Sequence, residues 1–435
     1  MSKLFNTVYE AMFYARNKSF YNKIQYLDQK HILAIQNRRL ANIIQIVTKT
    51  VPFYKPYNSE FDFKNFTLGD LKKLPIIDKA IMKKKPELFI NDKARVFERW
   101  QTSGSTGEPF VFRVPRYLRL IDRMVFLRAM SNENFRMTPT SPMVWIGSYA
   151  PLDKEPLYKR VGPVKNIWRL SPFHINDKNL DQYIDVMHRS KASVLTGYPS
   201  AIYLFTLLLQ KHDIRFPLVK VIKTASETLL PEHREIITTW WKLPVLDWYG
   251  QAEMTALVIQ CPYGNYHNQD DYGICEINKS NELILTSLHN FVTPFIRYNS
   301  KDIVEPVEES RNLYPCKCGR NFSIPFKKVI GRSNDLLWKL DGTMVPVVNF
   351  CTFFSKLSTV RQFKIIQKKD YSIDILIVAD SNFTDKAQII TGMQKRLGNI
   401  PINVLQVEAI PRNPHTMKQK FIESYLNENK KISTI

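Results

Sequence analysis

Apolar residues recur at nearly helical spacing in the first part of the chain. The positions form a series close to a 3.6-residue period, made up of Ile32, Leu33, Ile35, Leu40, Ile43, Ile44 and Ile46. This pattern predicts a helical lead-in over residues 1–60.

Short apolar runs alternate with helical stretches from about residue 95 to residue 330. The runs are typical of buried strands and read MVWIG, ASVLTG, VKVIKTAS and PVLDWYG. After Pro199, the segment AIYLFTLLLQKH predicts a helix, for which Ser200 is an available N-cap. The alternation indicates an α/β fold.

A second, smaller domain is predicted after the segment VIGRSNDLLW. The strand-like runs QFKIIQ and YSIDILIVAD and the helix-like run KAQIITGMQKRLG suffice for a small α+β domain. We therefore expect a large N-terminal domain over residues 1–330 and a mobile C-terminal lid domain over residues 331–435, with the hinge between Arg332 and Asp335.

The size of the chain agrees with more than one domain. It has 435 residues, a mass of 51.0 kDa and 44% hydrophobic residues. The apolar block AIYLFTLLL is too short to span a bilayer, and the amino terminus has no apolar core typical of a signal peptide. The odd number of cysteines, five, favours a reducing compartment. A cytoplasmic protein is expected.

The chain carries a net charge of +22. Its basic residues are spread along the sequence among acidic ones, without a recognisable nucleic-acid-binding motif. No specific nucleic acid is therefore expected as a partner. The charge favours a solvated basic surface, or attraction for anionic small molecules, carrier proteins or peripheral contact with acidic membranes.

The segment TSGSTGEPFVF gathers small hydroxylated residues and glycines in a chain with 14 glycines. Glycine permits the positive φ angles with which a loop turns several backbone N–H groups toward a phosphate. A flexible linker or an ordinary surface loop is the alternative, but the apolar run after the loop indicates a strand. The spacing is not that of a Walker P-loop. The candidate phosphate-binding residues are Thr102, Ser103, Gly104, Ser105, Thr106 and Gly107.

Four further motifs follow this loop in a fixed order: DWYGQAEMT, RYNSKDIV, GRSNDLL and IPRNPHTMKQKF. Together with the loop they resemble the adenylate-forming superfamily, and most closely its phenylacetate-CoA ligase-like branch, which includes capsule-biosynthesis relatives. The resemblance extends from about residue 51 to Phe421.

The resemblance implies a role for each matching residue. The glycine-rich loop would cradle the phosphates of ATP. Tyr249 and Gly250 would lie beside the adenine and the acyl substrate, and Glu253 would help to hold Mg²⁺. Asp302 would form hydrogen bonds with both ribose hydroxyls, and Arg332 would contact the nucleotide. Asp335 would lie at the inter-domain hinge, and Lys418 would contact the α-phosphate during adenylation.

The sequence departs from the family pattern in two places. The family commonly has glycine before the catalytic lysine, whereas Met417 precedes Lys418 here, so Lys420 is a competing assignment. Lys301 stands where many members have glycine before the ribose-binding aspartate.

A metal site is predicted from one histidine and three cysteines. Cys261 and His267 have the spacing C-x5-H, and Cys316 and Cys318 form C-x-C. Four nitrogen and sulfur ligands suit a closed, structural, tetrahedral Zn²⁺ site. The resemblance also implies such a zinc, since some relatives in this branch carry one.

The resemblance implies an enzyme that uses ATP and Mg²⁺ to adenylate a carboxylic acid and then transfers the acyl group. Attack of a carboxylate on the α-phosphorus brings two anions together, so Mg²⁺ and a lysine are needed to neutralise the charge. The expected acceptor is coenzyme A. An adenylating ligase of surface polysaccharide biosynthesis with an amine or carrier-bound acceptor is one alternative, and a nonenzymatic basic binding protein is another. Trp145 and Tyr198 are candidate walls of the acyl pocket.

Overall fold

Two long helices open the chain in the computed structural model. The structure describes residues 3–102, 110–132, 134–147, 149, 151, 155–162, 165–307, 316–332, 336–341, 344–346, 350, 353–354, 357, 359–411 and 420–426, without the side chains of 3–8, 332, 336, 344 and 346. The helices are α1 (Lys3–Lys23) and α2 (Gln29–Thr50). The carboxylate of Asp28 caps α2, since it accepts a 2.9 Å hydrogen bond from the backbone N–H of His31. The buried face of α2 carries Leu40, Ile44 and Val47.

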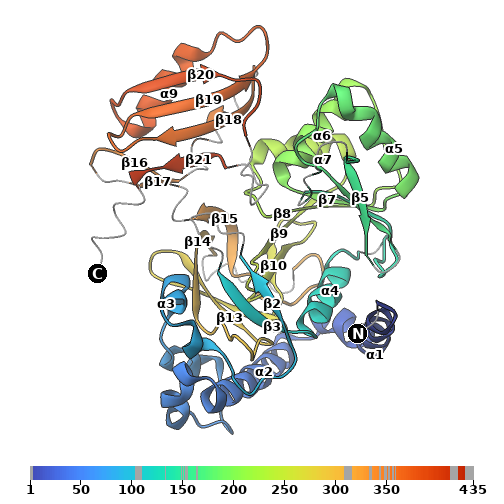
Figure 1. Ribbon diagram of the computed structural model, residues 1–435, viewed down its shortest axis with the longest axis vertical. Coiled ribbons are helices and arrows are strands. Elements are labelled where there is room, and N and C mark those ends of the chain that lie inside the picture. The colour runs from blue at the N-terminus through green and yellow to red at the C-terminus, as the bar shows by residue number, and fades with distance from the viewer. Residues whose placement is uncertain are drawn as a thin grey trace.

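An eight-stranded sheet forms the centre of the N-terminal part (Figure 1). Its order is β11-β10-β9-β8-β7-β4-β6-β5, and the five strands from β9 to β6 run parallel. In chain order the strands are β4 (Met143–Ile146), β5 (Tyr158–Val161), β6 (Ile167–Leu170), β7 (Val194–Gly197), β8 (Val221–Ala225), β9 (Val245–Gly250), β10 (Leu257–Gln260) and β11 (Tyr266–Asn268). The four apolar runs that predicted buried strands thus form β4, β7, β8 and β9.

Helices cover both faces of this sheet, as expected where parallel strands are joined by crossover helices. One face packs against α5 (Leu180–Ser190), α6 (Pro199–Lys211) and α7 (Pro231–Trp241). The other face packs against α4 (Leu118–Ala129). The N-cap predicted for α6 is wrong: Tyr198 is the N-cap and Pro199 begins the helix, because the fixed φ of proline suits the first helical position.

A second sheet joins distant parts of the sequence. Its order is β1-β14-β13-β12, and β15 pairs with β14. The strands are β1 (Ile77–Asp78), β12 (Gly273–Ile277), β13 (Glu282–Ser287), β14 (Tyr298–Pro306) and β15 (Phe326–Arg332). Near it lie the helix α3 (Lys79–Lys84) and a hairpin of β2 (Phe97–Gln101) and β3 (Val111–Pro115). The same part of the chain has four 3₁₀ turns, η1 (Ile24–Tyr26), η2 (Pro52–Glu60), η3 (Leu68–Lys73) and η4 (Pro86–Phe89). A further turn, η5 (Asp177–Asn179), precedes α5.

The C-terminal part has its own sheet and hydrophobic core, drawn in orange and red in Figure 1. The sheet order is β20-β19-β18-β21, with α9 (Lys386–Leu397) packed on it. The strands are β18 (Val360–Gln367), β19 (Ile373–Ala379), β20 (Ile402–Gln406) and β21 (Ile422–Ser424), and β16 (Leu336–Trp338) pairs with β17 (Met344–Pro346). The predicted α/β class with a smaller C-terminal domain is confirmed, whereas the boundary at residues 330 and 331 stays a prediction.

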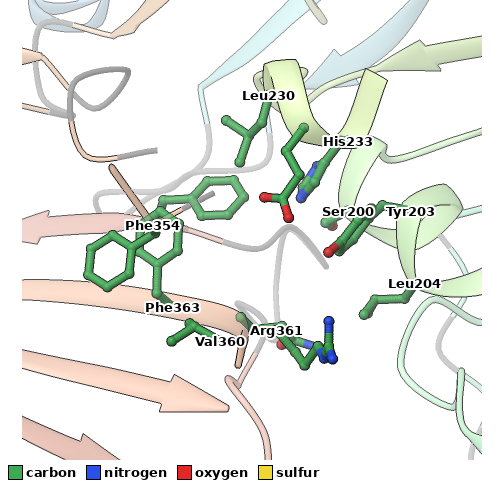
Figure 2. Close-up of a pocket in the computed structure, with 12 residues that line it drawn as sticks. Ser200, Tyr203, Leu204, Leu230, His233, Phe354, Val360, Arg361 and Phe363 are labelled. Atoms are coloured by element: carbon green, nitrogen blue, oxygen red, sulfur yellow. The ribbon is translucent and has the colours of Figure 1, made fainter. Parts of the chain in front are cut away.

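The two parts meet at helices α6 and α7. Leu230 belongs to the hydrophobic cluster of the C-terminal part. The rings of Tyr203 and His233 stack with centroids 4.1 Å apart, and His233 lies 6.4 Å from the ring of Phe421. Figure 2 shows the small pocket at this contact, with Tyr203 and His233 on one side and Arg361 of β18 on the other.

Candidate active site and metal centre

The glycine-rich loop connects the two strands of the hairpin β2–β3. At its base, the backbone N–H of Thr102 donates to the carbonyl of Phe110 at 3.0 Å. The hydroxyl of Thr102 accepts hydrogen bonds from the backbone N–H of Phe110 at 3.3 Å and from Nζ of Lys79 at 3.2 Å. The two ends of the loop are therefore hydrogen-bonded to each other, and an ammonium group lies at its base.

Tyr249 and Asp302 lie in direct contact although 53 residues separate them in the sequence. Tyr249 is near the carboxyl end of β9, and its hydroxyl donates a 2.7 Å hydrogen bond to Oδ2 of Asp302 on β14. Both side chains are buried. Burial raises the pKa of the Tyr249 phenol, and the Asp302 carboxylate raises it further, so this hydroxyl keeps its proton.

Glu253 follows β9 by three residues and is also buried. Its Oε1 accepts a 3.1 Å hydrogen bond from the hydroxyl of Tyr298, at the start of β14. Gly250 ends β9, and a Cβ there would lie 2.8 Å from Cδ2 of Leu257. The turn after β9 thus places a carboxylate and a close-packed glycine beside the Tyr249–Asp302 pair.

Lys301 adopts a left-handed conformation with φ of +61° immediately before Asp302. Glycine adopts such angles without strain, so a glycine would suit this position. Asp302 is paired across the antiparallel ladder with Arg332, the last residue of β15. The backbone therefore brings Arg332 to the same end of the site.

Several predicted residues lie outside the described part of the chain, namely Ser103, Gly104, Ser105, Thr106, Gly107, Asp335 and Lys418. Lys420 is described and exposed, and it lies two residues before the start of β21.

Cys261, His267, Cys316 and Cys318 come together at one edge of the N-terminal part. Their candidate ligand atoms all lie within 4.8 Å of one another. Sγ of Cys261 is 3.9 Å from Sγ of Cys316, and Sγ of Cys318 is 3.4 Å from Nε2 of His267. Tetrahedral zinc with Zn–S bonds of about 2.3 Å requires sulfur atoms roughly 3.8 Å apart. The donor set therefore fits a closed Zn²⁺ site.

The surroundings orient the histidine for this role. Nδ1 of His267 lies 3.0 Å from the carbonyl oxygen of Phe322, so the proton on Nδ1 is donated there and Nε2 is left to face the cysteines. Nδ2 of Asn265 donates to Sγ of Cys316 at 3.2 Å. A hydrogen bond from Cys318 holds the pKa of the Cys261 thiol below its usual value, which favours a thiolate within the group.

Sequence reasoning missed Lys79 and Tyr298, which contact Thr102 and Glu253. Tyr298 belongs to the motif RYNSKDIV, in which only the aspartate received a role, and no motif marks Lys79. It also missed a half-buried lysine, Lys223, within the run VKVIKTAS of β8. A single charge between apolar neighbours of a central strand is the signal that could have found it. In the part of the chain that the structure describes, no helix has the length and apolar character needed to cross a membrane.

Comparison of the C-terminal part identifies one family. Residues 337–424 match the model described as the CapK C-terminal domain. Over most of its length the chain is also similar to protein CapK of Staphylococcus aureus, with 24% identity over 392 residues that cover 87% of this chain and 86% of the relative.

Solved structures with the same fold include ligases. A 2-hydroxyisobutyryl-CoA ligase in its postadenylation state is similar with a TM-score of 0.69 and 15% identity, over 95% of this chain and 94% of that one. The TM-score to the thioesterification state of the same ligase is 0.56 at similar coverage. ATP-bound MatB from Rhodopseudomonas palustris is similar with a TM-score of 0.51 and 15% identity, over 77% of this chain and 68% of that one. The resemblance inferred from the motifs is thereby confirmed: the chain has the fold of the adenylate-forming ligases, and its residues 337–424 match the CapK C-terminal domain family.

Proposed function

We propose that this protein is an ATP-dependent ligase that adenylates a carboxylic acid with release of pyrophosphate and then transfers the acyl group to a thiol, with coenzyme A as the acceptor. The observation that carries the proposal is the buried contact between Tyr249 and Asp302 beside Glu253. A buried carboxylate fixed by a phenol can accept hydrogen bonds from two neighbouring hydroxyls, which a ribose offers.

The proposed roles follow the placement of the residues. Asp302 would bind the ribose, and Tyr249 would hold this carboxylate in place. The loop that starts at Thr102 would bind the phosphates, and the ammonium of Lys79 at its base adds positive charge there.

Glu253 offers one carboxylate to Mg²⁺, a hard cation that prefers oxygen ligands. When bound, the ion supplies charge neutralisation to the phosphates. Lys418, in the C-terminal lid over residues 331–435, would neutralise the charge that develops when the carboxylate attacks the α-phosphorus. This attack requires no general base, because the substrate carboxylate is already ionised.

The zinc site would be structural. All four positions of a tetrahedral ion would be filled by Cys261, His267, Cys316 and Cys318. The site joins the segment after β10 to the segment before β15, and its expected contribution is to the stability of the N-terminal part.

Acid-dependent release of pyrophosphate tests the proposal. Purified protein is incubated with ATP and Mg²⁺ and with a panel of aryl, fatty, amino and sugar acids. We expect at least one class to drive release. Absence of release with every class, in a protein that still binds ATP, would favour the nonenzymatic binding protein instead.

Similarity to CapK favours a second candidate for the acceptor. In this alternative the same adenylation serves surface polysaccharide biosynthesis, and the acyl group passes to an amine or a carrier-bound group. Trapping the acyl-adenylate and then adding coenzyme A or an amino sugar separates the two, since only the true acceptor accelerates the loss of the adenylate.

A further inference from the structure

One face of the central sheet carries a single lysine where its neighbours are apolar. Val221 and Lys223 of β8 and Leu246 and Trp248 of β9 point to the face that packs against α4, while Ile222 points to the opposite core. An amine placed within such a face loses much of its hydration, which costs free energy that a leucine at the same position would not cost.

The ammonium of Lys223 lies over aromatic rings. Nζ is 4.5 Å from the ring centroid of Trp248 and 5.4 Å from that of Phe126 on α4. Asp122, one turn before Phe126 on α4, is one nearby carboxylate, and its Oδ1 accepts a 3.4 Å hydrogen bond from the hydroxyl of Tyr272. The carboxylate of Asp247 on β9 also acts on the charge of Lys223. Lys223 and Asp122 influence the pKa of each other, yet no ion pair within 4.0 Å joins them among the described contacts.

Lys223, Asp122, Phe126 and Trp248 are each only half-buried, so the cluster that they form stays partly accessible to solvent. We call this partly accessible cluster the recess. The recess lies near the carboxyl ends of the parallel strands β8 and β9, the edge at which open α/β sheets bind ligands. Trp248 is followed directly by Tyr249 and Gly250, so the recess adjoins the candidate nucleotide site.

Both groups carry charge near neutral pH. Burial lowers the pKa of Lys223 to about 8 and raises that of Asp122 to about 6, with each charge opposing the shift of the other. The recess therefore presents a donor-only group and an acceptor-only group with a gap between them. An apolar acyl chain would leave both desolvated and unsatisfied.

Between the ammonium of Lys223 and the carboxylate of Asp122, a hydroxyl group of the substrate is more favourable than a charged group. It can accept a hydrogen bond from the ammonium and donate its proton to the carboxylate. A second carboxylate on the substrate would be repelled by Asp122, and an amine would be repelled by Lys223.

Another cation lies on the same face. Arg169 of β6 stacks on Trp145 at 4.4 Å, and the strand register aligns Arg169, Trp145, Thr196 and Lys223 in one row. Three strand spacings separate Arg169 from Lys223, roughly 14 Å. Arg169 is therefore beyond the reach of a group that bridges Lys223 and Asp122.

We propose that this recess is the acyl-recognition site and that Lys223 and Asp122 select a carboxylic acid bearing hydroxyl groups, an inference that rests on the proposed adenylation. Trp248 and Phe126 pack against the carbon skeleton of the acid. Lys223 and Asp122 act as specificity-determining residues and take no part in the transfer of the phosphoryl group.

The test compares acids of equal chain length that differ in their substituents. Gluconate, hexanoate, adipate and 6-aminohexanoate are assayed for kcat/KM in ATP–pyrophosphate exchange with the wild-type protein, Lys223→Met, Asp122→Asn and the control Lys220→Met, which changes an exposed lysine of the same segment. Wild type should prefer gluconate over hexanoate by ~100-fold or more, because a site built for hydroxyls rejects analogues without them. Lys223→Met should lose most of this preference, with unchanged ATP affinity, and Lys220→Met should retain it.

Binding of the same acids without ATP, followed by thermal stabilisation, separates the two proposals. If gluconate alone stabilises the protein, Lys223→Met removes this effect and no ATP–pyrophosphate exchange occurs, the recess binds hydroxyl-bearing acids but the proposed adenylation is contradicted. The proposed role of the recess would be wrong, although adenylation would be supported, if exchange favoured hexanoate, adipate or 6-aminohexanoate. The same conclusion would follow if wild type and Lys223→Met showed equal preference. Asp122→Asn keeps the shape of its side chain, so it serves as the decisive variant if Lys223→Met does not fold.

Discussion

The hydroxyl of Tyr249 donates a 2.7 Å hydrogen bond to the carboxylate of Asp302 and thereby joins β9 of the central sheet to β14 of the second sheet. Both residues are buried, so the bond is protected from competing water. The position of the candidate ribose-binding carboxylate is therefore fixed by a residue from the other sheet.

Replacing Asp302 with alanine should weaken ATP binding about tenfold or more, because charge-assisted hydrogen bonds of ~1.5–3 kcal/mol are lost. Tyr249→Phe should have a smaller effect, since the carboxylate remains. Calorimetric titration with ATP measures both, and Glu305→Ala on the same strand serves as the control. Wild-type affinity in a folded Asp302→Ala variant would remove this residue from the nucleotide site.

The sequence predicted the strands of the site better than their contacts. The motif around Tyr249 and the motif around Asp302 were visible as separate runs, and their order matched the family. The hydrogen bond between them depends on how two sheets pack, which no local pattern encodes. Lys79 was missed for the same reason: 23 residues separate it from Thr102, and only the fold brings its ammonium to the loop.

The metal ligands show how far spacing alone can lead. C-x5-H and C-x-C gave four donors but could not show that segments about 50 residues apart converge. The carbonyl of Phe322, which accepts from Nδ1 of His267, has no side-chain signature at all. Conversely, the predicted N-cap at Ser200 was wrong. Serine is a favoured N-cap, but Pro199 suits the first helical position, so α6 begins one residue earlier.

Purified protein prepared without chelator should contain about one zinc ion per chain. Cys316→Ser should release the metal and lower the melting temperature, because the binding free energy of a structural ion contributes to folding. Cys275→Ser is the matched control, since Cys275 contacts Asn268 and lies outside the four-residue group. Metal analysis that finds no zinc in the wild-type protein would refute the site.

Lys301→Gly should be tolerated and should raise the free energy of unfolding by between zero and about 1.5 kcal/mol. Glycine relieves a left-handed strain of roughly 1–2 kcal/mol but loses roughly 0.5–1 kcal/mol through the entropy of the unfolded chain. Lys328→Gly on β15, without a positive φ, should destabilise by about 1 kcal/mol. Urea denaturation compares the two, and equal destabilisation would contradict the explanation of φ at Lys301.

Stability should fall as the pH drops from about 6.5 toward 3, in part because of His233. Burial lowers the pKa of this imidazole to about 3, and Nδ1 has no hydrogen-bond partner. Below an unfolded pKa of about 6.5 the unfolded chain gains a proton that the folded chain does not, so stability is present above that range and lost below it. At about pH 5.5 the loss from one such histidine is about 1.4 kcal/mol.

His233→Phe should therefore show a smaller drop in stability between about pH 7.5 and pH 5.5 than the wild-type protein. Part of the dependence should remain, because burial also lowers the pKa of His289, to about 4. Urea denaturation of both proteins at the two pH values measures the difference. A slope equal to that of wild type in His233→Phe would show that this imidazole does not stay neutral.

The final prediction decides between Lys418 and Lys420. Lys420 is exposed, and its charge acts on Glu423, which already pairs with Lys364 at 2.8 Å. These are the surroundings of an ordinary surface lysine. Lys418→Ala should slow formation of the acyl-adenylate by ~100-fold or more, as expected for the loss of one preorganised electrostatic contact. Lys420→Ala should retain nearly full activity.

Two assays on each variant separate the half-reactions: pyrophosphate release for adenylation, and product formation from a supplied acyl-adenylate for transfer. Transfer should survive in Lys418→Ala, because the proposed lid turns this lysine away before the second step. Loss of adenylation in Lys420→Ala but not in Lys418→Ala would mean that Met417 shifts the motif by two residues and that Lys420 is the adenylation lysine. Full adenylation in both variants would instead mean that charge at the α-phosphate is neutralised from the N-terminal part, where Lys79 at the base of the glycine-rich loop is the residue to replace next.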